Sequence, residues 1–220
     1  MLIDELKEFL DKQKLKYGFS RIDHSDFAVE YRCALVIAVP YGKQLTLDTY
    51  SEKAFEQGIC EARDAIDRIL PRVEKILKMY SVKYYIPPVA QSDKTDLKAP
   101  FSFKFAAVNA ALGWIGKNDV LITQEYGPRV RLSAILCDYD FQCGTPIIAS
   151  KCPDECVECV RACPYKAISG RKWNIHSKRE ELINYYLCNQ KRELFIEKNG
   201  RKNACGLCMV ACPLGKGFDE

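Results

Sequence analysis

The sequence predicts a two-part chain, with an α/β domain over residues 1–148 and a smaller cysteine-rich domain over residues 149–220. Three observations carry this prediction. Helical and strand-like patterns intermix through the first 150 residues, eight of the twelve cysteines fall between Cys152 and Cys212, and the charge balance changes along the chain. From residue 161 onward 12 Lys and Arg stand against 6 Asp and Glu, whereas the first 160 residues carry 21 against 23. We place the boundary in the segment 145–150.

The elements of the first part follow from apolar spacing. Leu2, Leu6 and Leu10 recur at helical spacing and predict a first helix that stops before Gly18. The continuous apolar run CALVIAVP over residues 33–40 predicts a buried strand. A long helix is predicted over about residues 51–80, kinked or split at Pro71 because proline lacks a backbone N–H. Its apolar face comprises Ile59, Ala62, Ile66, Ile69, Val73, Ile76 and Leu77.

Shorter elements complete this part. Strands are expected over residues 82–86, 120–123 and 130–138, and a helix over residues 102–112 that leads into Gly113. A turn is expected at residues 126–128. Helices and strands that intermix in this way, with ample apolar surface, predict an α/β layer that folds independently.

Composition and charge exclude several classes of protein. With 48% apolar and 28% charged residues, the chain has the composition of a folded globular protein. No apolar run approaches the roughly 18–20 residues that cross a bilayer, and the opening residues MLIDELKEFLDKQ lack the apolar segment of an export signal. We therefore expect a cytoplasmic protein without membrane association, in which the cysteines are reduced and bind metal.

The eight clustered cysteines form two similar halves. The first is CPDECVECVRACP over residues 152–164, and the second is CGLCMVACP over residues 205–213, preceded by Cys188. Both halves end in the pattern C-x2-C-x3-C-P. This pattern resembles that of bacterial two-cluster ferredoxins, in which the last cysteine of each run ligates the other [4Fe–4S] cluster. The resemblance assigns the first cluster to Cys152, Cys156, Cys159 and Cys212, and the second to Cys163, Cys188, Cys205 and Cys208.

Two departures from the ferredoxin pattern leave alternatives open. The first pair is spaced C-x3-C, and sixteen residues separate Cys188 from Cys205. Cys143 therefore competes with Cys152 as a ligand. Two structural zinc sites of four cysteines each are the main alternative to iron–sulfur clusters, although zinc favours paired C-x2-C knuckles. Disulfides are the remaining alternative.

A wider resemblance covers about residues 95–215. Ala99-Pro100, the segment Gly-Trp-Ile-Gly-Lys-Asn over residues 113–118, YGPRVRLSAILCD over residues 126–138 and the cysteine strings are similar to the epoxyqueuosine reductase family, which is related to the reductive dehalogenases. The resemblance implies a nitroreductase-like mixed sheet that binds a corrinoid (cobalamin-type) cofactor, followed by a ferredoxin-like domain with two [4Fe–4S] clusters. The corrinoid would be lined by Gly113, Trp114, Ile115, Gly116, Lys117, Asn118, Pro128 and Arg129. Spacing alone favours a different interpretation of the Gly113–Asn118 segment, as a helix end with Trp114 in the core.

One position departs from this family. Its members carry a proton-donating acidic residue two positions before the Ala-Pro pair, where this chain has Leu97. The neighbouring Asp96 is the candidate substitute. By the same resemblance, we expect a short member of the family without its C-terminal tRNA-binding extension.

Three functions are compatible with these features, and each makes the chain a redox protein. In the first, an oxidoreductase passes single electrons through two clusters to a corrinoid and reduces a small substrate. In the second, the chain is an electron-transfer or activator protein that reduces a partner, for example a corrinoid enzyme. In the third, it is an epoxyqueuosine reductase acting on tRNA. All three require an electron donor of the ferredoxin or flavodoxin type.

Overall fold

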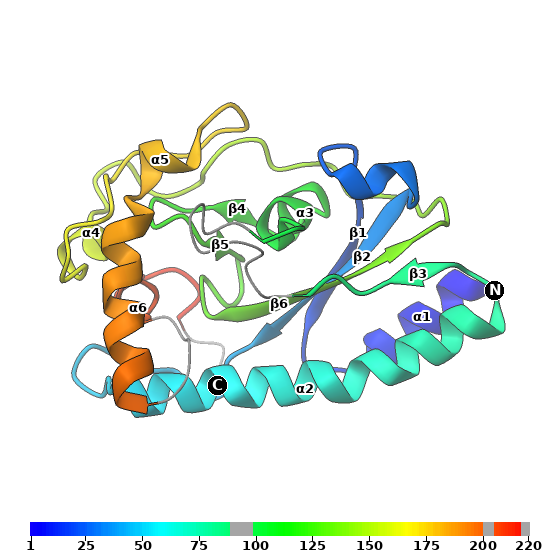
Figure 1. Cartoon of the computed structure of the whole chain (residues 1–220), viewed down its shortest axis with the longest axis horizontal. Coiled ribbons are helices and arrows are strands. Elements are labelled where there is room, and N and C mark those ends of the chain that lie inside the picture. Colours follow the sequence, from blue (N-terminus) through cyan, green and yellow to red (C-terminus); the bar gives the residue numbers. More distant parts are fainter. Residues whose placement is uncertain (89–98, 200–204, 217–220) are drawn as a thin grey trace. The chain divides into compact units, whose positions relative to one another are not determined.

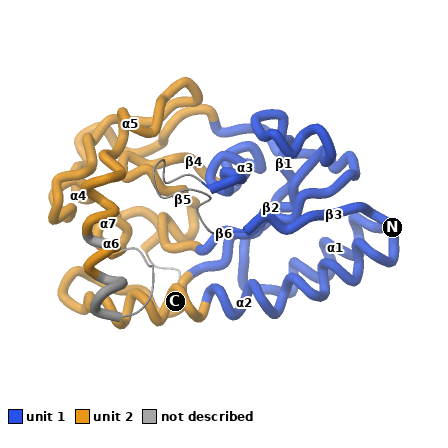
Figure 2. Tube along the Cα trace, in the orientation of Figure 1, with its two compact units in different colours: residues 1–40, 62–112, 131–147 blue, residues 41–61, 113–130, 148–220 orange. Residues whose placement is uncertain are grey.

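The computed structural model describes residues 1–88, 99–199 and 205–216 (Figure 1). The chain forms two compact units (Figure 2). Unit 1 comprises residues 1–40, 62–112 and 131–147, and unit 2 comprises residues 41–61, 113–130 and 148–220. Both helices and strands are present, which confirms the predicted α/β class.

Unit 1 is built on a four-stranded sheet with the order β1-β2-β6-β3. Its strands are β1 (Lys16–Arg21), β2 (Cys33–Pro40), β3 (Tyr84–Tyr85) and β6 (Val130–Cys137). β1 runs antiparallel to β2, with Lys16 opposite Ala38, and β3 runs antiparallel to β6. Every residue of β2 is buried, as expected for a continuous apolar run in a central strand.

Helices pack on this sheet. Helix α1 (Leu2–Leu10) buries Leu2, Leu6 and Leu10 as predicted. Helix α3 (Phe103–Asn109) contacts β1 and β2 and is shorter than expected, ending three residues before the predicted end. A short 3-10 helix, η1 (Asp26–Val29), lies between β1 and β2 in the chain. Gly18 does not stop a helix, since it lies within β1, where a Cβ atom would meet the carbonyl oxygen of Ala110 at 2.7 Å.

The long helix α2 (Glu52–Met79) runs through Pro71 without a break. The predicted split at this residue is therefore wrong. The apolar face that the sequence predicted is buried throughout, and packing of such a face contributes most of a helix's stability. Pro71 lies on the exposed side, so its ring does not interrupt that packing.

Replacing Pro71 by alanine is expected to raise the free energy of unfolding by about 1–3 kcal/mol, because alanine restores a backbone N–H and removes a ring that crowds the preceding turn. Urea unfolding measures this change. The neighbouring exposed variant Arg68→Ala is the control and should stay within about 0.5 kcal/mol of the parent. A loss of stability in Pro71→Ala would contradict this account of α2.

Unit 2 carries both cysteine half-motifs. Its elements are the strands β4 (Trp114–Ile115) and β5 (Leu121–Ile122), which pair antiparallel, and the helices α4 (Glu158–Arg161), α5 (Arg179–Leu182), α6 (Tyr185–Asn199) and α7 (Leu207–Val210). Helix α4 contains Cys159, helix α7 contains Cys208, and the two helices contact each other. The half-motifs therefore meet at their corresponding helical turns.

Unit 2 is not continuous in the sequence. Its last segment begins at residue 148, and residues 41–61 and 113–130 also belong to it. The reason is apolar packing that local sequence does not reveal. Phe55 and Ile59 form one core cluster with Met209 and Val210. Among the described helices, none has the length and apolarity required to span a membrane.

Candidate metal centres

The four cysteines predicted for the first centre line one cavity in unit 2. Cys152, Cys156 and Cys159 come from the first half-motif, and Cys212 comes from the end of the second. The wall of the cavity is completed by Lys117, Asn118, Ile122, Pro153, Pro213 and Leu214. The structure thus brings these four cysteines together, and their binding of a metal stays a prediction.

The thiols of this set influence one another electrostatically. Burial, together with the neighbouring thiols of Cys212, Cys152 and Cys156, raises the pKa of Cys159 to about 11. Burial also raises the pKa of Cys212, against a backbone hydrogen bond from Leu214 and the charge of Arg129, which lower it. Buried thiols of this kind ionise only when a cation compensates their charge. The set has the donor chemistry of a soft-metal site.

The second set also converges. Three of its cysteines pack against one apolar cluster of unit 2: Cys163, Cys188 and Cys208. Burial raises the pKa of Cys208 well above its ordinary value, and four neighbouring thiols add to the rise: Cys205, Cys188, Cys159 and Cys163. Because Cys159 belongs to the first set, the two sets are adjacent.

Two observations bear on the alternatives to clusters. All twelve cysteines are free thiols in this structure, so no disulfide joins them. Within residues 1–88, 99–199 and 205–216, no three His, Cys, Asp or Glu side chains are close enough to hold a single metal ion. The choice between zinc and iron–sulfur clusters rests on the C-x2-C-x3-C-P pattern, because zinc favours paired C-x2-C knuckles.

Cys143 does not share this cavity. Its sulfur lies 3.4 Å from that of Cys33 in unit 1, whereas Cys152 lines the cavity of unit 2. Of the two candidates for the leading ligand, the structure therefore places Cys152 with the other three cysteines.

Lys117 holds the loop of the first half-motif. Its Nζ donates to the carbonyl oxygens of Asp154 (2.7 Å) and Cys156 (2.9 Å), and only 4% of the residue is exposed. The amide Nδ2 of Asn118 donates to the carbonyl oxygen of Cys208 (3.3 Å) in the second half-motif. A buried ammonium is costly unless carbonyl oxygens and negative charge surround it. An anionic four-thiolate cluster in the adjacent cavity would supply that charge.

Arg129 holds the second half-motif. Its Nη1 donates to the carbonyl oxygens of Met209 (3.1 Å) and Cys212 (3.2 Å), and its Nη2 donates to that of Leu214. The preceding Gly127 has a φ of +56°, and a Cβ atom there would meet the Leu214 carbonyl oxygen at 2.0 Å. The turn Gly127-Pro128-Arg129 is therefore shaped to approach the chain that follows Cys212.

Several other residues predicted to line a corrinoid pack within unit 2. A Cβ atom on Gly113 would lie 2.1 Å from the Ile122 carbonyl oxygen, and one on Gly116 would lie 2.4 Å from the Ile122 side chain. Trp114 and Ile115 are buried in β4, and the Lys151 ammonium lies 5.8 Å from the Trp114 ring. Among the described residues, Trp114 Nε1 and Asn118 Oδ1 are buried without a hydrogen-bond partner, and the lining of a corrinoid by these residues stays a prediction. Asp96 and Leu97 lie outside the described residues.

Tyr50 and Gly206 are site residues that sequence reasoning missed. The Tyr50 hydroxyl donates to the carbonyl oxygen of Cys205 (2.5 Å), and burial raises the pKa of Tyr50, which keeps it protonated. Gly206 has a φ of +73°, and a Cβ atom there would lie 2.2 Å from the Phe55 ring. Tyr50 has no motif around it that could have signalled this role, whereas the glycine inside C-x2-C could have been noted.

Gly206→Ala is expected to lower the free energy of unfolding by about 2–4 kcal/mol, through left-handed backbone strain and a clash with Phe55. Gly170→Ala is the matched control. Its φ is +83°, but the nearest atom to a Cβ there, on Val160, is 3.3 Å away, so only about 1–2 kcal/mol of backbone strain is expected. Equal losses in the two variants, measured by urea unfolding, would refute the clash with Phe55.

Comparison with known proteins gives these features a family context. No family model matches the chain. The epoxyqueuosine reductase of Listeria monocytogenes is 29% identical over 198 residues, which cover 86% of this chain and 50% of that protein. The chain thus spans about half the length of this curated relative.

Solved structures show the same fold. An epoxyqueuosine reductase from Bacillus subtilis superposes with a TM-score of 0.65 at 18% identity, over 99% of this chain and 66% of that one. An epoxyqueuosine reductase solved with a stem loop of modified tRNA-Tyr gives a TM-score of 0.62 at 18% identity, over 99% and 65%. A catabolic reductive dehalogenase gives 0.65 at 16% identity, over 92% and 30%.

Proposed function

We propose that this chain, an epoxyqueuosine reductase-like protein related to the reductive dehalogenases, is an iron–sulfur reductase that binds two [4Fe–4S] clusters. The names of its relatives support the reductase role, and among them epoxyqueuosine reductase is the best supported activity. The single observation that carries the cluster proposal is the meeting of Cys152, Cys156 and Cys159 with Cys212 around one cavity. When bound, the two clusters supply one-electron carriers.

The chain's own residues have three roles in this proposal. The two cysteine sets hold the clusters, with Cys152, Cys156, Cys159 and Cys212 for the first and Cys163, Cys188, Cys205 and Cys208 for the second. Lys117 and Arg129 fix the loops that carry these cysteines, and their positive charges favour the reduced, more negative state. A backbone N–H of Ala167 donates to the Cys163 sulfur (3.3 Å), a contact of the kind that raises a cluster's reduction potential.

The finer assignments belong to the same proposal. We infer a nitroreductase-like fold for the sheet of unit 1 and a ferredoxin-like fold for the cysteine-rich part of unit 2. The physiological donor would be a ferredoxin or flavodoxin. A corrinoid is proposed from the family resemblance alone, because the contacts of residues 113–118 within unit 2 do not require one.

The proposed substrate is an epoxide-containing nucleoside in tRNA. Reduction of an epoxide to an alkene consumes two electrons and two protons and releases water, so a donor of single electrons must act twice. The basic C-terminal part, with 12 Lys and Arg from residue 161 onward, suits a phosphate backbone. Asp96 remains the predicted proton donor.

The substrate proposal is tested with anaerobically purified protein, a chemical reductant, added cobalamin and tRNA that carries epoxyqueuosine. Mass spectrometry of the digested tRNA should show the loss of one oxygen from the modified nucleoside. Cys208→Ser is the matched control and should be inactive, because the second cluster would be missing. Binding of the tRNA should weaken steeply with salt. An unmodified epoxide with intact clusters and bound cobalamin would refute this substrate.

A second candidate function is an electron-transfer or activator protein that reduces a partner enzyme. One observation favours it. Gly113 and Gly116 pack closely against Ile122, and Lys117 donates hydrogen bonds to the loop of the first half-motif, so these contacts do not require a ligand. In that case the chain would retain no cobalamin and leave its absorption spectrum unchanged, and it would still reduce a corrinoid protein when supplied with electrons. Retained and reduced cobalamin would instead favour a reductase with its own substrate.

A further inference from the structure

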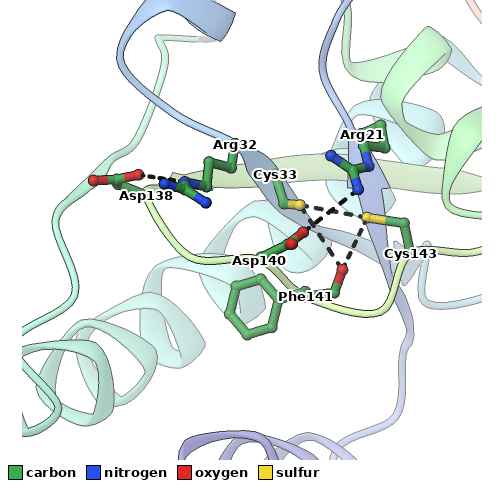
Figure 3. Close-up of polar contacts among 7 residues, drawn as sticks. All are labelled: Arg21, Arg32, Cys33, Asp138, Asp140, Phe141 and Cys143. Atoms are coloured by element: carbon green, nitrogen blue, oxygen red, sulfur yellow. Dashed lines mark hydrogen bonds and ion pairs between the residues drawn. The ribbon is translucent and has the colours of Figure 1, made fainter.

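Four cysteines lie outside the two predicted centres, and two of these meet in unit 1. The sulfurs of Cys33 and Cys143 are 3.4 Å apart, as Figure 3 shows. Cys33 opens β2 and is fully buried, whereas Cys143 is half-buried on the segment that follows β6. Both are free thiols. A disulfide bond of about 2.05 Å requires the sulfurs to approach by little more than 1 Å.

The fold holds the two sulfurs opposite each other. Both thiols are directed at the carbonyl oxygen of Phe141, at 3.4 Å from Cys143 and 3.9 Å from Cys33 (Figure 3). The Phe141 ring stacks on Phe19 with 4.3 Å between centroids, and the N–H of Gly144 donates to the Phe19 carbonyl oxygen (2.9 Å). The segment that carries Cys143 is thus fastened to β1 on both sides of the thiol, which lowers the entropic cost of bond formation.

Opposite charges flank the partly exposed thiol. Arg21 and Asp140 form an ion pair (3.6 Å) beside Cys143, as Figure 3 shows. Burial, the hydrogen bond to Cys33 and the charge of Asp140 together raise the pKa of Cys143 to about 12, against Arg21, which lowers it. Cys143 therefore rests as a neutral thiol, and its oxidation by a small disulfide should take minutes to hours.

We propose that Cys33 and Cys143 are a thiol oxidation site that closes to a reversible disulfide, independent of the eight cysteines of the metal centres. The oxidant is a low-molecular-weight disulfide. Cys143 attacks it and releases one thiol, then Cys33 attacks the Cys143 sulfur of the mixed disulfide and releases the second thiol. The protein's sulfurs lose two electrons, the small disulfide gains them, and the two protons pass from the protein thiols to the released thiols. Closure fastens the start of β2 to the segment after β6.

The direct test incubates the intact, anaerobically purified protein with glutathione disulfide, blocks remaining thiols by alkylation and maps the peptides by mass spectrometry. The expected result is one peptide pair joined through Cys33 and Cys143, with iron content unchanged. Cys137 is the alternative disulfide partner for Cys33, because the two thiols are close enough to interact electrostatically. Cys137 is fully buried. A link through Cys137, or a stable glutathione adduct on Cys143 without a link, would overturn the proposal.

Thermal unfolding gives a second readout. Cys33 and Cys143 are 110 residues apart in the sequence. A cross-link that closes a loop of this length should raise the melting temperature by roughly 10 °C, and dithiothreitol should reverse the rise. Cys143→Ser should abolish the shift, whereas Cys137→Ser should retain it. An unchanged melting temperature in the cross-linked protein would show that the disulfide does not fasten β2 to the segment after β6.

Charge variants test the role of the ion pair in the oxidation rate. Asp140→Asn should lower the pKa of Cys143 and speed cross-linking, and Arg21→Gln should raise this pKa and slow cross-linking. A change of one pKa unit should change the rate by about threefold, because a less basic thiolate is more abundant but also less nucleophilic. Asp138→Asn is the matched control, because Asp138 pairs with Arg32 (3.2 Å) on the same segment and does not act on Cys143. Equal rates in all three variants would exclude these charges as determinants of the oxidation rate.

Discussion

The Cys212→Ser variant is expected to retain about four iron atoms per chain, against about eight in the parent, because it removes one ligand of a single [4Fe–4S] cluster. Cys212 reaches the cavity of the first half-motif, where it lies with Cys152, Cys156 and Cys159. The control is Cys60→Ser, which lies outside both sets and should retain the parent's iron. Iron analysis after anaerobic purification measures the effect.

Double variants distinguish crosswise ligation from ligation within each half-motif. If the cavity contacts reflect ligation, Cys152→Ser combined with Cys212→Ser damages one cluster twice and leaves about four iron atoms. Combining Cys152→Ser with Cys163→Ser damages both clusters and leaves almost none. Ligation within each half predicts the opposite pair of results. The reversed outcome would overturn the assignment of both sets.

Lys117→Met is expected to lower the free energy of unfolding by about 2–4 kcal/mol, because it removes a buried charged donor from two backbone carbonyl oxygens. These are the carbonyls of Asp154 and Cys156, at 2.7 and 2.9 Å from Nζ. Removing a positive charge from the wall of the first cavity should also lower the reduction potential of the cluster there. Urea unfolding and redox titration of the anaerobic protein measure the two effects.

The matched control for this variant is Lys172→Met. Lys172 also contacts Asp154, but it does so on the surface, with a 2.8 Å ion pair whose side chains are 39% and 80% exposed. Exposed ion pairs contribute little, so the loss should stay below about 0.5 kcal/mol. Equal effects of the two substitutions on stability and potential would show that Lys117 has no special role in the cysteine loop.

Sequence patterns predicted the elements whose apolar residues dominate. The run over residues 33–40 became the fully buried strand β2, and the seven-residue apolar face of α2 is buried in full. Strand β1 was not predicted, because KYGFSR contains charges and a glycine and has no apolar run. Its strand conformation depends on its pairing with β2, which local sequence does not reveal. The break at Pro71 failed because packing of the opposite face outweighs a local preference.

The grouping of the cysteines was predictable from the sequence, and the residues that hold their loops were not. The C-x2-C-x3-C-P repeat and its ferredoxin resemblance predicted both cysteine sets, and the structure brings each set together. Metal binding by these sets stays a prediction. The roles of Lys117 and Arg129 could not be inferred, because they depend on carbonyl groups far along the chain. The same holds for residues 41–61, which join unit 2 only through contacts such as Phe55 with Val210.

The measurement that tests the central claim most directly is the joint quantification of iron, acid-labile sulfide and zinc in the anaerobically purified chain. Two [4Fe–4S] clusters predict about eight iron and about eight sulfide per chain, with zinc near zero. About two zinc per chain without sulfide would contradict the claim and assign the eight cysteines to two structural zinc sites.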